Sequence, residues 1–176
     1  PRNAIADWDA DNSRVTLYTG SQGVHFVLDQ LMDGVLHQDK SKLRVVSGNV
    51  GGGFGMKAFV YPEHAMTVVA AQQLGRTVRW QSDRSEAFLS DNQGRDHHSF
   101  AEVALDQDGH FLAVRVTTYA NMGAYLSPFG CYVPTGSSDL IAGLYKTPAI
   151  SVNVKGICTN TTPVCAYRGA GRPEAS

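Results

Sequence analysis

Several large classes of protein are excluded by what the sequence lacks. The chain of 176 residues has no basic stripe, and its 15 Lys and Arg against 16 Asp and Glu give a formal net charge of -1. Nucleic acid is therefore not expected as a partner. No stretch approaches the roughly 20 apolar residues that a membrane-spanning helix needs, so no membrane span is expected. With 43% hydrophobic and 18% charged residues, the composition instead predicts a folded globular chain.

Motifs of zinc sites and of serine hydrolases are also missing. The three cysteines contain no CxxC pair, which predicts reduced thiols rather than a disulfide framework or a structural zinc site. The six histidines form no HExxH or HxH pattern and are expected to be surface or packing residues. Gly20-Ser21-Gln22-Gly23 falls one residue short of a GxSxG nucleophile motif.

The hydrophobic periodicity predicts an α+β fold, a mixed β-sheet with packed helices plus a β-hairpin. The expected strands are 5–8, 15–18, 43–46, 77–80, 100–105, 111–119 and 150–154. The expected helices are 21–36 with Ser21 as N-cap, 62–74 closed by Gly75, and 83–88 opened by Asp83. Residues 121–148 are rich in Gly, Pro, Ser and Tyr and are expected to be irregular.

An Asp-x-Asp-Gly sequence at residues 106–109 invites comparison with a calcium-binding loop. An EF-hand requires an acidic residue at its twelfth position, and Thr117 stands there. The segment is therefore predicted to be the turn of the hairpin between 100–105 and 111–119.

The strongest local signal is the glycine loop Gly51-Gly52-Gly53-Phe54-Gly55, directly after a predicted strand. Without Cβ atoms, the backbone N–H groups of such a loop can approach an anionic or oxo ligand closely, and a plain tight turn is the alternative. A Walker A loop is excluded because Met56 precedes Lys57 and Ala58 follows it. A dinucleotide GxGxxG motif also fails, here and at Gly169 and Gly171, because the third glycine is absent.

A second glycine segment lies near the end of the sequence. Arg168 and Arg172 flank Gly169-Ala170-Gly171. A guanidinium here could bind a carboxylate, a phosphate or a developing oxyanion, although an isolated arginine is more often a surface ion-pair residue. Taken alone, the residues predict two backbone-exposing loops on an α+β scaffold and an anionic cofactor that they do not name.

These two loops and the segments between them resemble the large, molybdopterin-binding subunit of the xanthine oxidase family, in its branch of carbon monoxide dehydrogenase-like and aldehyde dehydrogenase members. The motifs that carry the resemblance, in this order along the chain, are Thr19-Gly20-Ser21-Gln22, Leu43-Arg44-Val45-Val46, residues 51–57, Arg79-Trp80, Asp83-Arg84-Ser85-Glu86 and residues 166–174. Pro1-Arg2 resembles a segment inside a much longer chain. Residues 1–176 are therefore expected to be a fragment of the molybdenum cofactor-binding domain.

The resemblance implies a molybdenum hydroxylase, an oxidoreductase that oxidises its substrate with water as the oxygen source. It implies molybdenum-molybdopterin in the cytosine dinucleotide form, with [2Fe–2S] clusters and FAD on partners. Those partners would be a FAD-containing medium subunit and a [2Fe–2S] small subunit, in a cytoplasmic dimer of heterotrimers. The family's catalytic glutamate would lie beyond Ser176, so the fragment alone is expected to be inactive.

The resemblance also carries roles to particular residues. Gln22 matches a glutamine that donates a hydrogen bond to a molybdenum oxygen, and Phe54 matches a residue whose backbone faces the metal's ligands. Arg168 matches an arginine that orients the substrate and stabilises negative charge. The expected cofactor-facing wall consists of Gly52, Gly53 and Gly55.

Two departures from the family pattern bear on the substrate. Carbon monoxide oxidisers have cysteine where this chain has Gly169, and purine oxidisers usually have glutamate where it has Ala58. An aldehyde or an N-heterocycle is therefore the expected substrate. The alternatives are a carbon monoxide or purine oxidiser, or a non-catalytic module that holds a phosphate-bearing ligand.

Overall fold

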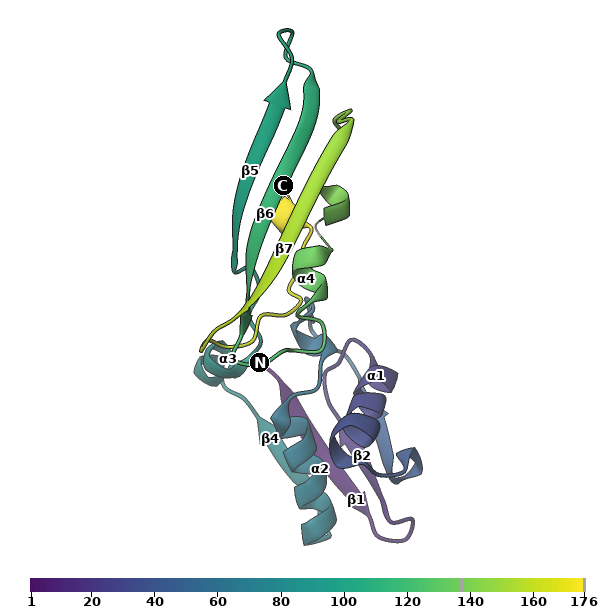
Figure 1. The fold of residues 1–176 in the computed structure, drawn as a ribbon. Coiled ribbons are helices and arrows are strands. Elements are labelled where there is room, and N and C mark those ends of the chain that lie inside the picture. Colours follow the sequence, from purple (N-terminus) through teal and green to yellow (C-terminus); the bar gives the residue numbers. More distant parts are fainter. Residues whose placement is uncertain (137, 176) are drawn as a thin grey trace. The chain divides into compact units, whose positions relative to one another are not determined.

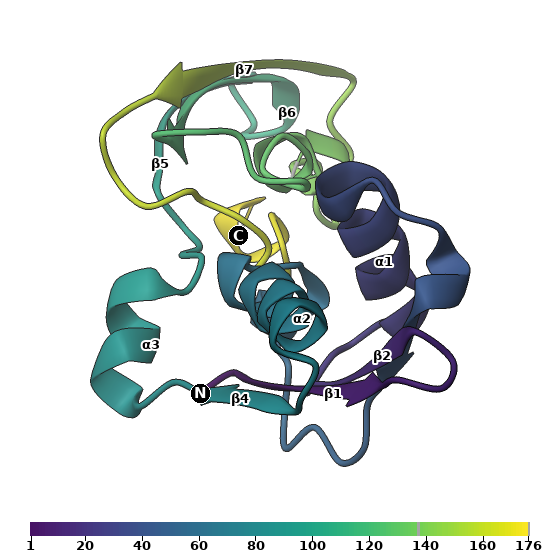
Figure 2. The same cartoon turned by 90° about the horizontal axis from the view of Figure 1, so that it is seen from below.

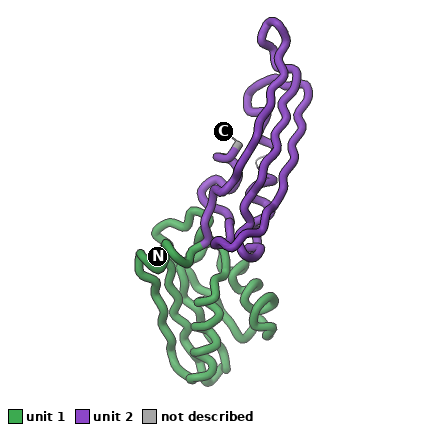
Figure 3. Tube along the Cα trace, turned by 60° about the vertical axis from the view of Figure 1, so that its left-hand side comes forward, with its two compact units in different colours: residues 1–91 green, residues 92–176 purple. Residues whose placement is uncertain are grey.

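The computed structural model of the chain describes residues 1–136 and 138–175. Residue 137, inside the segment predicted to be irregular, and Ser176 lie outside the described residues. The chain forms two compact units, residues 1–91 and residues 92–176 (Figure 3). Both units are built on a mixed β-sheet, which confirms the α+β prediction.

The first unit contains a four-stranded sheet in the order β3-β2-β1-β4. Strands β1 (Asn3–Asp9) and β2 (Arg14–Tyr18) form the predicted antiparallel hairpin. Strand β4 (Val78–Gln81) pairs antiparallel with the other edge of β1, and β3 (Leu43–Val46) pairs parallel with β2. The glycine loop follows β3, as predicted.

Helices α1 (Val24–Asp29) and α2 (Pro62–Leu74) lie on the same face of this sheet (Figure 2). The prediction of Ser21 as the N-cap of α1 is wrong, because Gly23 occupies that position. The Ser21 hydroxyl accepts a hydrogen bond from the N–H of Gly23 at 3.0 Å, so it closes the turn before the helix. The helical path continues beyond α1 as a wider π-helix, Gln30–Leu36.

The predicted limits of the other helices in this unit are largely confirmed. Helix α2 begins with Pro62 in its first turn and ends before Gly75, which has a left-handed φ of 60°. Asp83 caps α3 (Arg84–Ser90) by accepting a hydrogen bond from the N–H of Glu86 at 2.7 Å. Short 3-10 turns complete the unit at Lys40–Lys42 and Met56–Ala58.

The hydrophobic core of the first unit lies between the sheet and the helical residues of α1, the π-helix and α2. It is formed by the inward residues of the strands and the apolar residues of the helices, namely Ala4, Ala6, Val15, Leu17, Val27, Leu31, Met32, Leu43, Val68 and Ala71. Trp8 and Trp80 are partly buried against this cluster. Alternation of buried residues with partly or fully exposed ones in β1 and β2 explains why the sequence predicts this hairpin well.

The second unit contains a three-stranded sheet of long strands in the order β5-β6-β7 (Figure 1). Strands β5 (His97–Leu105) and β6 (Phe111–Gly123) form the predicted hairpin, and β7 (Ala149–Cys158) pairs parallel with β6. Strand β6 runs beyond its predicted end. The segment predicted to be irregular also contains α4 (Tyr132–Thr135) and a 3-10 turn at Ser138–Leu140, and another 3-10 turn spans Pro173–Ala175.

Burial in the second unit is concentrated near the end of β6. The hydrophobic residues buried there are Ala120, Met122, Val133, Val164 and Cys165. All three cysteines are free, with Cys131 and Cys158 exposed and Cys165 buried, which confirms the prediction of unpaired thiols. Within the described ranges, no helix has both the length and the apolar character needed to cross a membrane.

Candidate cofactor site

The glycine loop of the first unit has a backbone that ordinary residues rarely adopt. The φ angles of Gly51, Gly52 and Gly55 are 67°, 106° and 92°, in the range that glycine adopts freely. Phe54 also has a positive φ, 55°, which is uncommon for a residue with a side chain. Its ring is half-exposed, so its burial does not explain this conformation.

Gln22 lies against this loop and is held in one orientation. The N–H of Gly55 donates a 2.8 Å hydrogen bond to Oε1 of Gln22, and the N–H of Gln22 donates to the carbonyl of Lys57 at 3.0 Å. A backbone N–H can only donate, so the amide oxygen must face Gly55. The Nε2 group of Gln22, with its two N–H donors, therefore points away from this bond.

Two glycines of the loop are required by close contacts. A Cβ atom at Gly53 would lie 2.5 Å from the side-chain carbon Cδ of Gln22. A Cβ atom at Gly52 would lie 2.6 Å from the ring of Phe54. Both distances are far below van der Waals contact, so any side chain at either position would displace Gln22 or Phe54.

The loop also presents backbone donors. Within residues 1–136 and 138–175, the N–H groups of Gly52 and Gly53 donate no hydrogen bond, although both residues are only partly exposed. Nε2 of Gln22 likewise has no hydrogen-bond partner among the described residues, so the loop and Gln22 offer neutral donors beside positions where a Cβ atom would clash. Neutral donors of this kind suit the oxygen or sulfur ligands of an anionic cofactor, so the residues present fit a molybdenum-pterin group.

The second glycine segment belongs to the other unit and has a similar backbone. Gly169, Ala170 and Gly171 have consecutive positive φ angles of 108°, 48° and 98°. The side chain of Arg168 is exposed. A Cβ atom at Gly169 would lie 2.7 Å from Cδ of Pro173, so no side chain fits at this position in the observed conformation.

Arg95 supports the backbone of this segment, and sequence reasoning did not single it out. Its guanidinium donates to the carbonyl of Tyr167 at 2.9 Å and to the carbonyl of Arg168. The same group lies 5.3 Å from the centre of the Tyr167 ring. These contacts join residues more than 70 positions apart, so no local sequence pattern could reveal them.

The structure thus brings five of the six predicted site residues together, namely Gln22, Gly52, Gly53, Phe54 and Gly55. Arg168 lies on the separate glycine segment of residues 92–176. The predicted roles of all six remain predictions.

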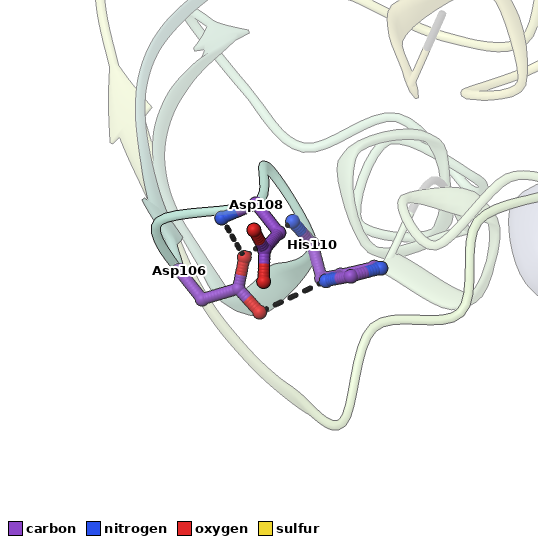
Figure 4. A group of neighbouring side chains, drawn as sticks. All are labelled: Asp106, Asp108 and His110. Atoms are coloured by element: carbon purple, nitrogen blue, oxygen red, sulfur yellow. Dashed lines mark hydrogen bonds and ion pairs between the residues drawn. The ribbon is translucent and has the colours of Figure 1, made fainter.

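Three potential metal ligands also meet at the hairpin turn of the second unit (Figure 4). The ligand atoms of Asp106, Asp108 and His110 lie within 4.8 Å of one another, and all three residues are exposed. Asp106 accepts hydrogen bonds from the N–H groups of Asp108 and His110 at 2.9 and 2.8 Å and pairs with Nδ1 of His110 at 2.9 Å. These bonds lower the pKa of Asp106 and account for the arrangement as the closure of a turn.

The family of the chain follows from comparison with known proteins. A family model described as the molybdopterin cofactor-binding domain matches residues 1–176. The chain belongs to this family.

The similar proteins share the whole region but are much longer. The carbon monoxide dehydrogenase large chain of Hydrogenophaga pseudoflava is 36% identical over 171 residues, which cover 93% of this chain and 20% of that protein. The nicotine 6-hydroxylase large subunit of Paenarthrobacter nicotinovorans is 30% identical over 175 residues, covering 97% and 21%. The crystal structure of quinoline 2-oxidoreductase from Pseudomonas putida 86 superposes with a TM-score of 0.90 at 33% identity, covering 97% and 22%. The chain therefore spans about a fifth of the length of these relatives.

Proposed function

We propose that residues 1–176 form one wall of the molybdenum site in a hydroxylase that oxidises an aldehyde or an N-heterocycle with water as the oxygen source. The observation that carries the proposal is the orientation of Gln22, whose Oε1 is held by the N–H of Gly55 at 2.8 Å. This bond leaves both N–H donors of Nε2 available for an oxygen ligand of the cofactor. A glutamine amide is neutral, so it can donate to such a ligand without adding charge.

The other predicted residues complement this role. The backbone of Gly52, Gly53 and Phe54 would face the ligands of the metal, with Gly55 engaged in fixing Gln22. Arg168 would orient the substrate and stabilise negative charge that develops on it. The bound molybdenum-pterin group would supply the two-electron redox chemistry, and the protein residues would supply binding and orientation.

The substrate class is supported by two positions and by the names of relatives. Residue 169 is glycine, so this chain has no thiol where carbon monoxide oxidisers have cysteine, and a Cβ atom there would clash with Pro173. The missing thiol argues against carbon monoxide as the substrate. Ala58 provides no carboxylate at the position where purine oxidisers usually have glutamate. Two relatives are named quinoline 2-oxidoreductase and nicotine 6-hydroxylase. These names support an N-heterocycle as one of the two proposed substrate classes.

The proposal extends to the assembly around this chain. The cofactor would be the cytosine dinucleotide form, and electrons would leave through a [2Fe–2S] small subunit to a FAD-containing medium subunit. A cytoplasmic dimer of heterotrimers is the proposed assembly. Because the chain spans about a fifth of its relatives, a catalytic glutamate would come from sequence beyond residues 1–176.

The full-length parent tests the proposal. It should contain about one molybdenum per large subunit and oxidise an N-heterocycle or an aldehyde with an artificial electron acceptor. Gln22→Ala should alter the Mo(V) electron paramagnetic resonance (EPR) spectrum. Active protein without molybdenum, or an unchanged Mo(V) spectrum in Gln22→Ala, would refute the proposal.

The role of Arg168 needs a separate kinetic test. Arg168→Ala should lower kcat/KM by about 100-fold at unchanged molybdenum content, in line with the loss of a charge-stabilising group. Arg115→Ala is a suitable control, because Arg115 is an exposed arginine whose ion pair with Glu102 is also exposed. Equal kinetics of Arg168→Ala and the wild type would remove Arg168 from the mechanism.

A further inference from the structure

The N-terminal end of helix α2 makes hydrogen bonds to both chain segments that contribute to the Gln22–Gly55 hydrogen bond. One segment is residues 19–22, which ends at Gln22, and the other is residues 47–57, which includes the glycine loop. Tyr61, the N-cap of α2, and His64, in its first turn, each bond to one of these segments.

The hydrogen bonds of His64 have a fixed direction. The N–H of Tyr61 donates to Nδ1 of His64 at 3.2 Å. A backbone N–H can only donate, so Nδ1 carries no proton and the neutral ring carries its proton on Nε2. Nε2 therefore donates to the hydroxyl of Thr19 at 3.2 Å.

Thr19, which accepts the hydrogen bond of His64, is itself bonded to strands of the sheet and begins the segment that leads to Gln22. Its hydroxyl donates to the carbonyl of Asn3 at 2.7 Å, and its own N–H donates to the carbonyl of Val46 at 3.0 Å. Two residues further on, the N–H of Ser21 donates to the hydroxyl of Ser47 at 3.1 Å. The backbone from Thr19 to Gln22 is thus tied along its length to the segment that leads into the glycine loop.

Tyr61 holds the other segment. Its phenol hydroxyl donates to the carbonyl of Met56 at 2.9 Å. Met56 directly follows Gly55, whose N–H fixes the amide of Gln22. One helical turn therefore restrains both partners of the Gln22–Gly55 hydrogen bond.

The three side chains that make these bonds are almost fully buried. The exposed fractions of His64, Tyr61 and Thr19 are 3%, 4% and 5%. The bonds of His64 are buried and that of Tyr61 to Met56 is partly buried, so removing one of these side chains would leave a donor or acceptor with little access to water unpaired. The segments would then shift to restore a partner, and the Gln22 amide would move with them.

We propose that His64 and Tyr61 are positioning residues for the Gln22 amide, holding residues 19–22 and the glycine loop in the register that presents Nε2 to the oxygen ligand of the cofactor. The inference rests on the proposed function and adds two residues that would touch neither substrate nor cofactor.

The test uses the full-length enzyme with its cofactor and compares Tyr61→Phe, His64→Leu and Val68→Ala. Tyr61→Phe deletes only the hydroxyl, so it preserves the shape of the side chain and should fold. Val68→Ala is the control, because Val68 is fully buried in the same helix but belongs to the hydrophobic core. The measurements are the Mo(V) EPR spectrum, molybdenum content, kcat, KM and the unfolding midpoint.

Tyr61→Phe and His64→Leu should change the Mo(V) spectrum and lower kcat about 10-fold or more, with a smaller change in KM. Val68→Ala should lower the unfolding midpoint and leave the spectrum and kcat unchanged. The inference is overturned if Val68→Ala produces the same spectral change, or if Tyr61→Phe leaves both spectrum and kcat as in the wild type. A Gln22→Ala variant distinguishes failure of the positioning role from failure of the proposed function, because an unchanged spectrum in that variant would refute the proposed function itself.

Discussion

Acidification from pH 7 to pH 5 is expected to destabilise the unit of residues 1–91 by about 2 kcal/mol, through His64 alone. Burial lowers the pKa of His64 from 6.5 to about 4, with the positive charge of Arg2 acting in the same direction and Glu63 opposing it. The unfolded chain would bind the proton near pH 6.5, whereas the folded unit would resist it until about pH 4.

The sign follows from proton binding. Between pH 6.5 and about 4, the unfolded state binds more protons than the folded state, so stability falls as the pH falls. A pKa difference of about 2.5 corresponds to about 3 kcal/mol when complete, and about 2 kcal/mol of it is lost between pH 7 and 5.

Glu63, a partly buried carboxylate paired with Arg2, acts in a lower pH range. Burial alone would raise the pKa of Glu63, but the hydrogen bond and charge of Arg2 lower it below 4.5. Its stabilising effect is thus lost only as the pH falls below about 4.5. Measurements between pH 7 and 5 therefore isolate the contribution of His64.

Tryptophan fluorescence provides a selective assay. The chain contains two tryptophans, Trp8 and Trp80, and both pack against the core of residues 1–91. Urea unfolding followed by this signal should give a free energy of unfolding that falls by about 2 kcal/mol between pH 7 and 5. His97, whose pKa is also lowered by burial, lies in the other unit, which contains neither tryptophan.

His64→Gln is the matched variant, because it cannot titrate in this range. It should be less stable than the wild type at pH 7 but nearly independent of pH between 7 and 5. A wild type with no pH dependence in this range, or a His64→Gln variant with the same slope as the wild type, would refute the assignment of a buried neutral histidine.

Three further substitutions have expected outcomes set by the structure. Gly53→Ala should displace Gln22, since the new Cβ would lie 2.5 Å from its Cδ, and the full-length enzyme should lose molybdenum or show an altered Mo(V) spectrum. Gly169→Ala should lower kcat/KM of the full-length enzyme by distorting the segment that carries Arg168, because φ there is 108° and a Cβ would contact the proline ring at residue 173; unchanged kinetics would contradict this. Arg2→Met should reduce the stability of the first unit by about 3–5 kcal/mol, because it leaves two carboxylates without their buried partner, and a urea midpoint equal to that of the wild type would disprove it.

Local sequence patterns predicted the elements whose signals are contained within a few residues. The alternation of Ala4 and Ala6, and of Val15 and Leu17, with more exposed neighbours specifies the first hairpin. Pro62 and Gly75 mark the ends of α2 because each suits the backbone of that terminus. Family resemblance, rather than periodicity, picked out the predicted cofactor-site residues.

Some predictions failed where a nearby alternative competed. Ser21 has the chemistry of an N-cap, but its hydroxyl bonds to the N–H of Gly23, and α1 begins only after that residue. Strand β6 runs on to Gly123, through a region whose glycines and polar residues predict a loop. Its parallel pairing with β7 supplies partners that the local sequence does not reveal.

The sequence by itself thus determined the α+β character, the main strands and helices, and the order of motifs that identifies the family. Tertiary structure alone decided that Gln22 meets Gly55 across 33 positions and that its amide is oriented by that contact. It also decided that His64 is almost fully buried, which lowers its pKa to about 4. The physical reason is that strand and helix periods are properties of neighbouring residues, whereas a hydrogen bond between distant segments and the desolvation of a side chain depend on how the whole unit packs.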